Sequence, residues 1–278
     1  MSVQGIADRH YLRLPCLHKE SGGSMRRLEL KLILLIILMC LAFASAAYAL
    51  KPLIFGVEKA MEIEQTVEDF LETAETAQQE IQHPFPVPSP PAEPLVQMPI
   101  AYEDLLNDMK HYNCSLFTYR QRDLDSKSAY EQSQFRLSDY GLPSETFGVI
   151  TIPKMSLEMP LFLGASEANM ANGAAVLSQT SIPIGGDSTN AVIAGHRGWS
   201  GYKYFMDIEL QELGDEVTIT NLWGTLTYQV VDIQIVSPDD VDAILIQQGR
   251  DMITLLTCHP PNTGGRYRYL VFCERVKD

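Results

Sequence analysis

The hydrophobic pattern is strongest near the N-terminus. Residues 32–50 form an uncharged run of 19 residues, LILLIILMCLAFASAAYAL. A helix needs about 20 apolar residues to cross a bilayer core, so the run predicts a transmembrane helix. Two arginines and a lysine precede it, and the positive-inside rule then places residues 1–31 in the cytoplasm as a tail and the rest outside. Small residues at 44–49 also fit a signal-peptide cleavage site, but the length of the run favours an uncleaved anchor.

The next part of the chain alternates between helical and extended patterns. Residues 51–82 carry apolar side chains three and four positions apart opposite a Glu- and Gln-rich face, which predicts a helix that is either a packed stalk or largely solvated. Residues 83–99 hold seven prolines and predict an extended linker. Residues 100–147 return to helical spacing and form a helical N-terminal extension.

Met25 could open a conventional leader, which leaves open whether Met1 or Met25 is the true start.

From residue 148 to 278 the pattern changes to short β-branched and aromatic runs separated by Gly, Pro, Asn and Asp. There are eight such runs with little helix between them: FGVITIP, MPLFL, AAVL, NAVIAG, EVTITNL, TLTYQVVDIQIV, MITLLT and RYRYLVFCERV. The fold class is therefore all-β with minor helices, and the domain is a barrel or a sandwich.

The composition of the chain disfavours several classes of function. The formal net charge is −14, which disfavours nucleic acid as a partner. The five cysteines include no C-x-x-C pair, so a zinc ribbon is not expected, and their odd number and irregular spacing do not fit a disulfide framework. Cys114 and Cys273 are interpreted as small buried apolar residues.

One cysteine has a different context. Cys258 ends the apolar strand DMITLLTC and is followed at once by HPPNTGG, so it lies at the rim of the sheet. If the next strand folds back as a hairpin, it brings an arginine beside the thiol. His196 also follows the end of a strand, in AVIAGHRG. A thiol, a proton carrier and a cationic donor are what cysteine catalysis of acyl transfer requires.

Here the chain resembles the sortase family. Residues 254–258, Thr-Leu-Leu-Thr-Cys, match the family's T-L-x-T-C signature. Residues 195–198 resemble its histidine motif, residues 268–271 its final-strand arginine motif, and residues 148–154 its first barrel strand. The resemblance spans about residues 140–276, with its motifs in the family's order.

The resemblance implies an eight-stranded β-barrel and a cysteine transpeptidase at the cell membrane of a Gram-positive bacterium, with its catalytic domain extracellular. Cys258 would attack the Thr–Gly bond of a Leu-Pro-x-Thr-Gly-like sorting signal on surface proteins or pilins. The thioacyl enzyme would then pass the signal to an amine, either a pilin lysine or peptidoglycan. His196 would carry protons, and Arg268 would stabilise the oxyanion or hold the substrate.

Within the family the chain looks most like class C, the pilin polymerases, because TLLTC is followed, after one histidine, by proline and R-x-L-V-x-x-E-R covers residues 268–275. It departs from class C in two ways. Residues 100–147 contain no Asp-Pro, which the usual lid carries, and no C-terminal apolar run follows the last strand. Pilus assembly is the expected role, and anchoring of proteins to the cell wall by a sortase of another class is the alternative.

Several rival readings stay open. His259 adjoins Cys258 and could be the base, although adjacent side chains on a strand diverge. Arg266 would share a strand face with Arg268 and could replace it. Arg197 is interpreted as a surface or pocket-rim cation. Two alternative functions are a papain-like cysteine protease and a non-enzymatic tethered binding module. A papain-like protease would place its histidine after the cysteine in the sequence.

Overall fold

The computed structural model describes residues 22–82, 102–119, 121, 124, 130–199, 201–261 and 263–277. The chain divides into two compact units, Met1–Lys51 and Pro52–Asp278. The proline-rich linker predicted at 83–99 lies outside the described residues, as does most of the predicted cytoplasmic tail.

Short strands dominate the second unit, with a few helices between them. The helices are α1 (Gly22–Gln82), α2 (Glu103–Tyr119) and α3 (Glu167–Asn172), with short 3-10 turns η2 (Leu137–Tyr140), η3 (Pro153–Met155), η4 (Ile208–Leu210) and η5 (Val241–Ile244). The strands are β1 (Thr146–Ile152), β2 (Leu157–Leu163), β3 (Ala174–Val176), β4 (Thr189–Ala194), β5 (Arg197–Trp199), β6 (Tyr202–Tyr204), β7 (Glu216–Asn221), β8 (Gly224–Val236), β9 (Asp251–His259) and β10 (Tyr267–Arg275).

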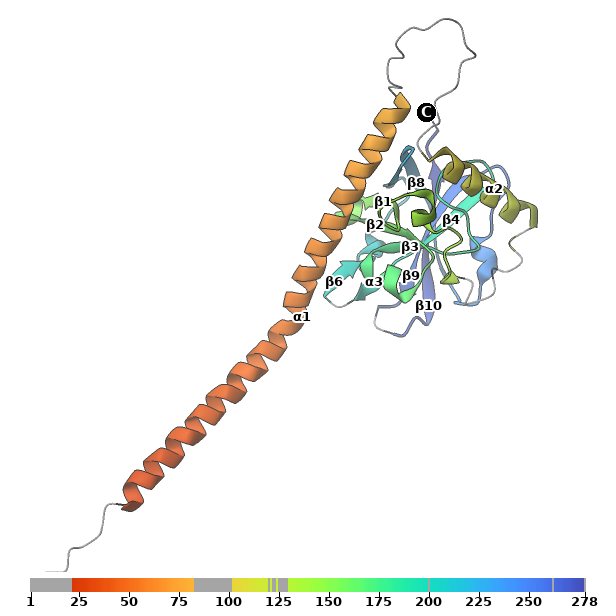
Figure 1. The fold of residues 1–278 in the computed structure, drawn as a ribbon. Helices are drawn as coiled ribbons and strands as arrows, with labels where there is room; N and C mark the ends of the chain where they lie inside the picture. The colour runs from red at the N-terminus through yellow and green to blue at the C-terminus, as the bar shows by residue number, and fades with distance from the viewer. Residues whose placement is uncertain are drawn as a thin grey trace, which may run out of the picture. The chain divides into compact units, whose positions relative to one another are not determined.

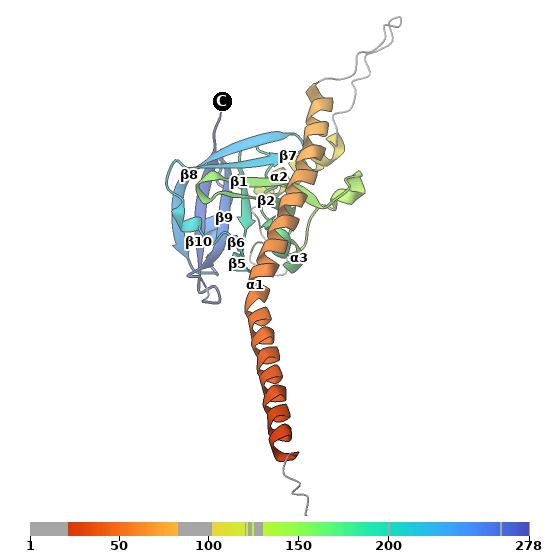
Figure 2. The same ribbon diagram turned by 90° about the vertical axis from the view of Figure 1, so that its left-hand side faces the viewer.

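Eight of these strands close into a barrel in the order β1-β2-β3-β4-β9-β10-β8-β7 (Figures 1 and 2). Neighbouring strands are antiparallel except for the pairs β2–β3 and β4–β9, which are parallel. The barrel strands correspond to the eight apolar runs of the sequence, so the predicted eight-stranded barrel is confirmed. The β5–β6 hairpin lies outside the barrel order and was not predicted.

Alternation along the strands separates the barrel interior from its outer face. On β9, Ile253 and Leu255 join the main core inside the barrel, whereas Met252 and Leu256 belong to a second apolar cluster on the other face. Leu270 of the neighbouring β10 belongs to the second cluster as well. On β4, β9 and β10, every second residue therefore projects from the same face of the barrel wall.

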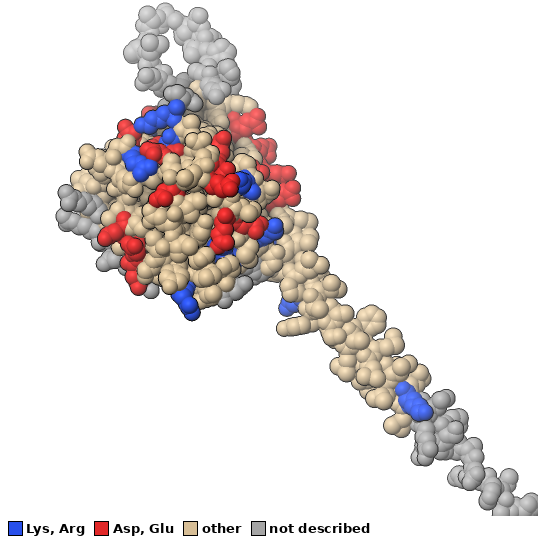
Figure 3. All heavy atoms as spheres, turned by 180° about the vertical axis from the view of Figure 1, so that it is seen from behind, with Lys and Arg blue, Asp and Glu red and all other residues tan. Residues whose placement is uncertain are grey.

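Helix α1 contributes to both units. It runs without a break through the two segments that the sequence predicted separately. The part of the chain that the structure describes has one helix long and apolar enough to cross a membrane, and this is α1. In Figure 3 its apolar stretch is drawn in tan without charged side chains, whereas carboxylates are spread over the visible surface of the second unit.

The second half of α1 is a packing helix rather than a solvated one. Its apolar stripe is buried in the same core as the barrel: Ile63, Val67, Phe70, Ala74 and Ala77. Gln78 Nε2 also donates to the main-chain oxygen of Asn221 at the end of β7, over 2.9 Å. Burial of these side chains stabilises the unit by roughly 1.5–3 kcal/mol for each large apolar residue.

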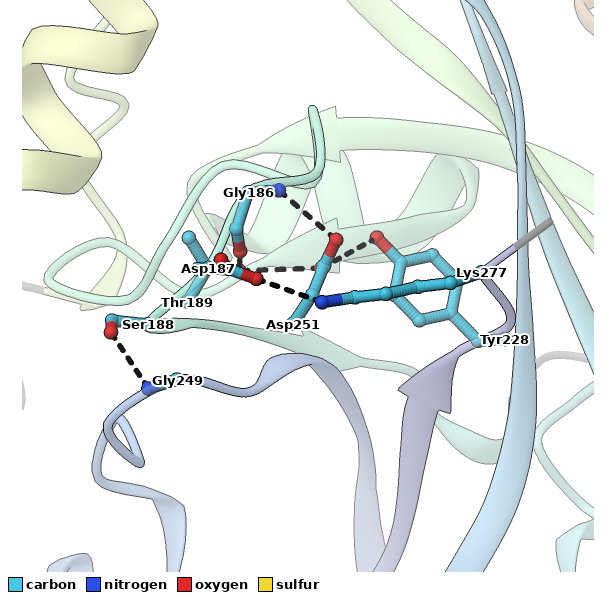
Figure 4. Close-up of polar contacts among 8 residues, drawn as sticks. All are labelled: Gly186, Asp187, Ser188, Thr189, Tyr228, Gly249, Asp251 and Lys277. Atoms are coloured by element: carbon cyan, nitrogen blue, oxygen red, sulfur yellow. Dashed lines mark hydrogen bonds and ion pairs between the residues drawn. The ribbon is translucent and has the colours of Figure 1, made fainter.

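A buried carboxylate fixes the register of β4 against β9 (Figure 4). Asp251, the first residue of β9, pairs with Thr189, the first residue of β4. Its carboxylate accepts hydrogen bonds from the Gly186 main-chain nitrogen at 3.0 Å and from the hydroxyls of Thr189 and Tyr228 at 3.3 Å each. Burial raises the pKa of this carboxyl. A shift of the β4–β9 pairing by one residue would break these contacts. The contacts therefore also keep the far ends of the two strands in register.

Candidate active site

Cys258 lies near the end of β9 with its side chain exposed. It is two residues beyond Leu256, so it projects from the outer face of the barrel wall, above the second apolar cluster. Apolar residues on both faces make β9 a central strand, and the following Pro260 and the glycines at 264 and 265 end the pairing. The structure therefore places Cys258 at the rim, where the sequence predicted it.

Arg268 lies directly across from Cys258. The two residues are paired with each other across the antiparallel strands β9 and β10. Their pair lies two positions nearer the connecting loop than the pair of Leu256 and Leu270. Arg268 Nη1 donates to the Gly265 oxygen at 2.7 Å and to the Tyr267 oxygen at 3.2 Å. These bonds hold the guanidinium at the loop that connects the two strands.

Gly265 shows how close the thiol and the guanidinium are. A Cβ built on this residue would lie 3.1 Å from Cys258 Sγ and 2.8 Å from Arg268 Nη1. Its φ of +77° also favours glycine. The two functional groups thus face a single point at which the chain leaves no room for a side chain.

Arg266 does not share this position. It is exposed and precedes β10, which begins at Tyr267. The expectation that Arg266 and Arg268 occupy one strand face was therefore wrong, because the hairpin pairing starts one residue after Arg266. The register leaves Arg268 as the arginine level with the thiol.

His196 completes the group from the other neighbouring strand. In the parallel pairing of β4 with β9, Ala194 is level with Leu256, and the Gly195 nitrogen donates to the Leu256 oxygen at 3.1 Å. His196 lies two residues beyond the end of β4 and Cys258 two residues beyond Leu256, so both follow the last pair of the two strands at the same edge of the sheet. His196 is half-buried, and burial lowers the pKa of its imidazole. The ring of Tyr204 packs edge-on against it at 5.7 Å.

An apolar pocket of about 320 Å³ adjoins this group on the same face. Arg268, Leu256 and Leu270 form the part of its wall that belongs to β9 and β10. The remaining lining comes from the chain before the barrel, from β3 and its exit, and from the segment between β8 and β9: Tyr130, Leu177, Val236, Ser237, Pro238, Asp240, Val241 and Ile244. An extended peptide with apolar side chains could lie here with a carbonyl close to Cys258.

His259 points away from this group. Strand alternation places it on the other face of β9, where its ring stacks near Tyr269 at 5.6 Å. Its Nδ1 lies 3.1 Å from Glu209 Oε1. The structure thus separates His259 from the thiol side, as the divergence of adjacent side chains predicted.

Arg197 is buried, so its interpretation as a surface or pocket-rim cation was wrong. Its Nη2 lies 2.7 Å from Glu209 Oε1, and its Nε donates to the Met206 oxygen at 3.0 Å. The sequence did not reveal this partner, because Glu209 sits in η4, after the unpredicted hairpin. The signal that could have found the hairpin is the alternation of aromatic residues around Gly201.

Cys273 and Cys114 lie in different surroundings. Cys273 is buried in the barrel core, as predicted, and burial raises its pKa. Cys114 is exposed on α2, contrary to the expectation that it is buried, because the helix turns Asn113 and Leu116 inward instead. Among the described residues no group of three or more His, Cys, Asp or Glu side chains could hold a metal ion.

Comparison with known proteins identifies the barrel. A family model described as a sortase domain matches residues 150–276. Sortase D of Bacillus subtilis (strain 168) is 26% identical over 153 residues, which are 54% of this chain and 74% of that protein. Sortase A of Bacillus anthracis is 31% identical over 132 residues, 48% of this chain and 60% of that protein.

Solved structures agree with the sequence relatives. Sortase C1 of GBS Pilus Island 1 matches with a TM-score of 0.63 at 25% identity, over 77% of this chain and 98% of that chain. Sortase C-1 from Streptococcus pneumoniae matches with a TM-score of 0.60 at 27% identity, over 77% and 99% of the two chains. Residues 150–276 of this chain thus match the sortase domain, and the fold of its β-barrel is similar to that of class C sortases.

Proposed function

We propose that this chain is a membrane-anchored transpeptidase that uses Cys258 as its nucleophile, His196 as its proton carrier and Arg268 as its oxyanion donor. The observation that carries the proposal is the strand register. Cys258 is paired with Arg268 of β10, and Cys258 and His196 each follow by two residues the last β4–β9 pair, Leu256 and Ala194. The adjoining apolar pocket supports a peptide substrate at this face.

The first half of the reaction breaks a peptide bond. Neutral His196 takes the proton of the Cys258 thiol, the resulting thiolate adds to the Thr carbonyl carbon of a Leu-Pro-x-Thr-Gly-like sorting signal, and the carbonyl oxygen becomes an oxyanion. Arg268, held at the rim by the Gly265 oxygen, donates to that oxygen. The C–N bond to glycine then breaks, and the leaving amine takes a proton from His196. The product is a thioester on Cys258.

The second half forms a new bond. An acceptor amine attacks the thioester carbon and gives a proton to His196, and the C–S bond breaks to restore the thiolate. The lowered pKa of His196 keeps its imidazole neutral at neutral pH, in the form that can accept this proton. One amide is exchanged for another, so no cofactor is consumed.

The acceptor in this proposal is a lysine of a pilin, and the reaction assembles a pilus. Similarity to class C sortases supports this choice, including sortase C1 of GBS Pilus Island 1. The second candidate is attachment of surface proteins to a peptidoglycan amine, which similarity to sortases A and D supports. In both cases the apolar segment of α1 anchors the chain and the barrel works outside the membrane.

The test uses the purified full chain in detergent with a sorting-signal peptide. One reaction contains no amine, a second a pilin-type lysine peptide, and a third a peptidoglycan-type amine. We expect mass spectrometry to find a ligated amide with the lysine peptide and only slow hydrolysis without an amine. Hydrolysis at equal rates in all three reactions would indicate a protease, and preference for the peptidoglycan amine would indicate wall anchoring.

A further inference from the structure

A single carboxylate oxygen lies behind the site. Glu209 Oε1 is 2.7 Å from Arg197 Nη2 and 3.1 Å from His259 Nδ1. Glu209 comes from η4, which belongs to neither of the two strands that carry these partners. The carboxylate thus joins two segments that are 62 positions apart in the chain.

The two partners are the residues that directly follow His196 and Cys258. Because alternate residues project to opposite faces, a contact made by Arg197 and His259 fixes the backbone of their neighbours without entering the reaction face. The regular β4–β9 pairing ends at Ala194 and Leu256, two residues before His196 and Cys258. Beyond that point the Glu209 side chain connects the start of β5, at Arg197, with the end of β9, at His259.

Burial of Arg197 stabilises its ion pair with Glu209. The Arg197 side chain is only 5% exposed, and its guanidinium also lies over the ring of Tyr269 at 5.7 Å. A buried cation without a partner is strongly unfavourable, so Arg197 and Glu209 are held together. The hydrogen bond from Arg197 lowers the pKa of Glu209, which keeps this carboxylate ionised at neutral pH.

We propose that Glu209 is a positioning residue that sets the separation of His196 and Cys258 by clamping Arg197 and His259 from the face opposite the substrate. This inference rests on the proposed function. It predicts an effect on the chemical steps rather than on substrate binding, because the apolar pocket lies on the other face and does not include Glu209. Displacement of a catalytic group by about 1 Å can lower a rate by up to about 10²-fold.

The test compares three variants of the full chain in detergent, assayed by ligation of a sorting-signal peptide to an amine. Glu209→Ala removes the clamp. Glu209→Gln keeps an oxygen at the same reach, which can still accept from Arg197. Glu212→Ala is the matched control, since Glu212 forms an exposed ion pair with Lys154 at 2.7 Å three residues further along. Thermal unfolding verifies that each variant is folded at the assay temperature.

We expect kcat of Glu209→Ala to fall about 10-fold with KM within about twofold of the unmodified chain, and we expect Glu209→Gln to recover most of that loss. Glu212→Ala should match the unmodified chain in both constants. The inference is overturned if kcat of Glu209→Ala is unchanged, if KM alone changes, or if Glu212→Ala loses as much. If the unmodified chain forms no ligated product, the proposed function fails and takes this inference with it.

Discussion

Substitution of the glycines at 264 and 265 separates proximity to the site from backbone strain. Both residues have positive φ, +71° for Gly264 and +77° for Gly265. Alanine at either position therefore carries a similar strain of about 1–2 kcal/mol. A Cβ at 264 would meet nothing within 4 Å, whereas a Cβ at 265 would meet the thiol at 3.1 Å and the guanidinium of Arg268 at 2.8 Å.

Gly264→Ala and Gly265→Ala should therefore lose similar amounts of stability, but Gly265→Ala should lose much more activity. In Gly265→Ala the flexible end of Arg268 is the group that can move, so the fold survives but the oxyanion loses its donor. Loss of one such donor costs about 2.7–4 kcal/mol in the transition state, which lowers the rate by about 10²–10³-fold. Gly264→Ala should stay within a few-fold of the unmodified chain.

The assay is kcat/KM for ligation of one sorting-signal peptide to one amine, with thermal unfolding recorded in parallel. The expected result is a small and equal loss of Tm in both variants and a large loss of kcat/KM in Gly265→Ala alone. Equal kcat/KM in the two variants would refute the reasoning, because the thiol and the guanidinium would then not need the space that glycine leaves.

Three further predictions test individual side chains. Arg268→Lys should lose about 3 kcal/mol in kcat/KM because an ammonium cannot copy the planar fork of donors, whereas Arg266→Lys should lose far less; a larger loss at Arg266 would contradict the hairpin register. His196→Ala should lower turnover by about 10²-fold or more, and turnover near the unmodified rate would remove it from the mechanism. Phe70→Ala should lower the free energy of unfolding by about 3–5 kcal/mol in denaturant titrations, since Phe70 is buried, whereas the exposed control Glu68→Ala should change little; equal effects would mean that α1 does not pack on the barrel.

Much of the barrel was predictable because its strands carry a local signal. Each strand is a β-branched or aromatic run ended by Gly, Pro, Asn or Asp, and the eight runs give the eight strands. The rim positions of Cys258 and His196 followed from where two of these runs end. The apolar stripe of α1 was also visible, although only the structure decided that it is packed rather than solvated.

The errors concern contacts between distant segments. Whether Arg266 or Arg268 lies level with the thiol depends on where the hairpin pairing begins, and the loop sequence does not fix that residue. The strands β5 and β6 have only three residues each, so the alternation of aromatic residues around Gly201 is a weak signal. Arg197 looked like a surface cation because its partner Glu209 is supplied by a turn that follows this hairpin.

The most direct test of the account is the mass of the chain after incubation with a sorting-signal peptide in the absence of an amine. We predict a covalent adduct equal to the peptide up to its Thr, mapped by digestion to the segment that contains Cys258. The adduct should be absent in Cys258→Ala and should disappear when an amine is added. An adduct on the exposed Cys114, or ligation by Cys258→Ala, would contradict the assignment of Cys258 as the nucleophile.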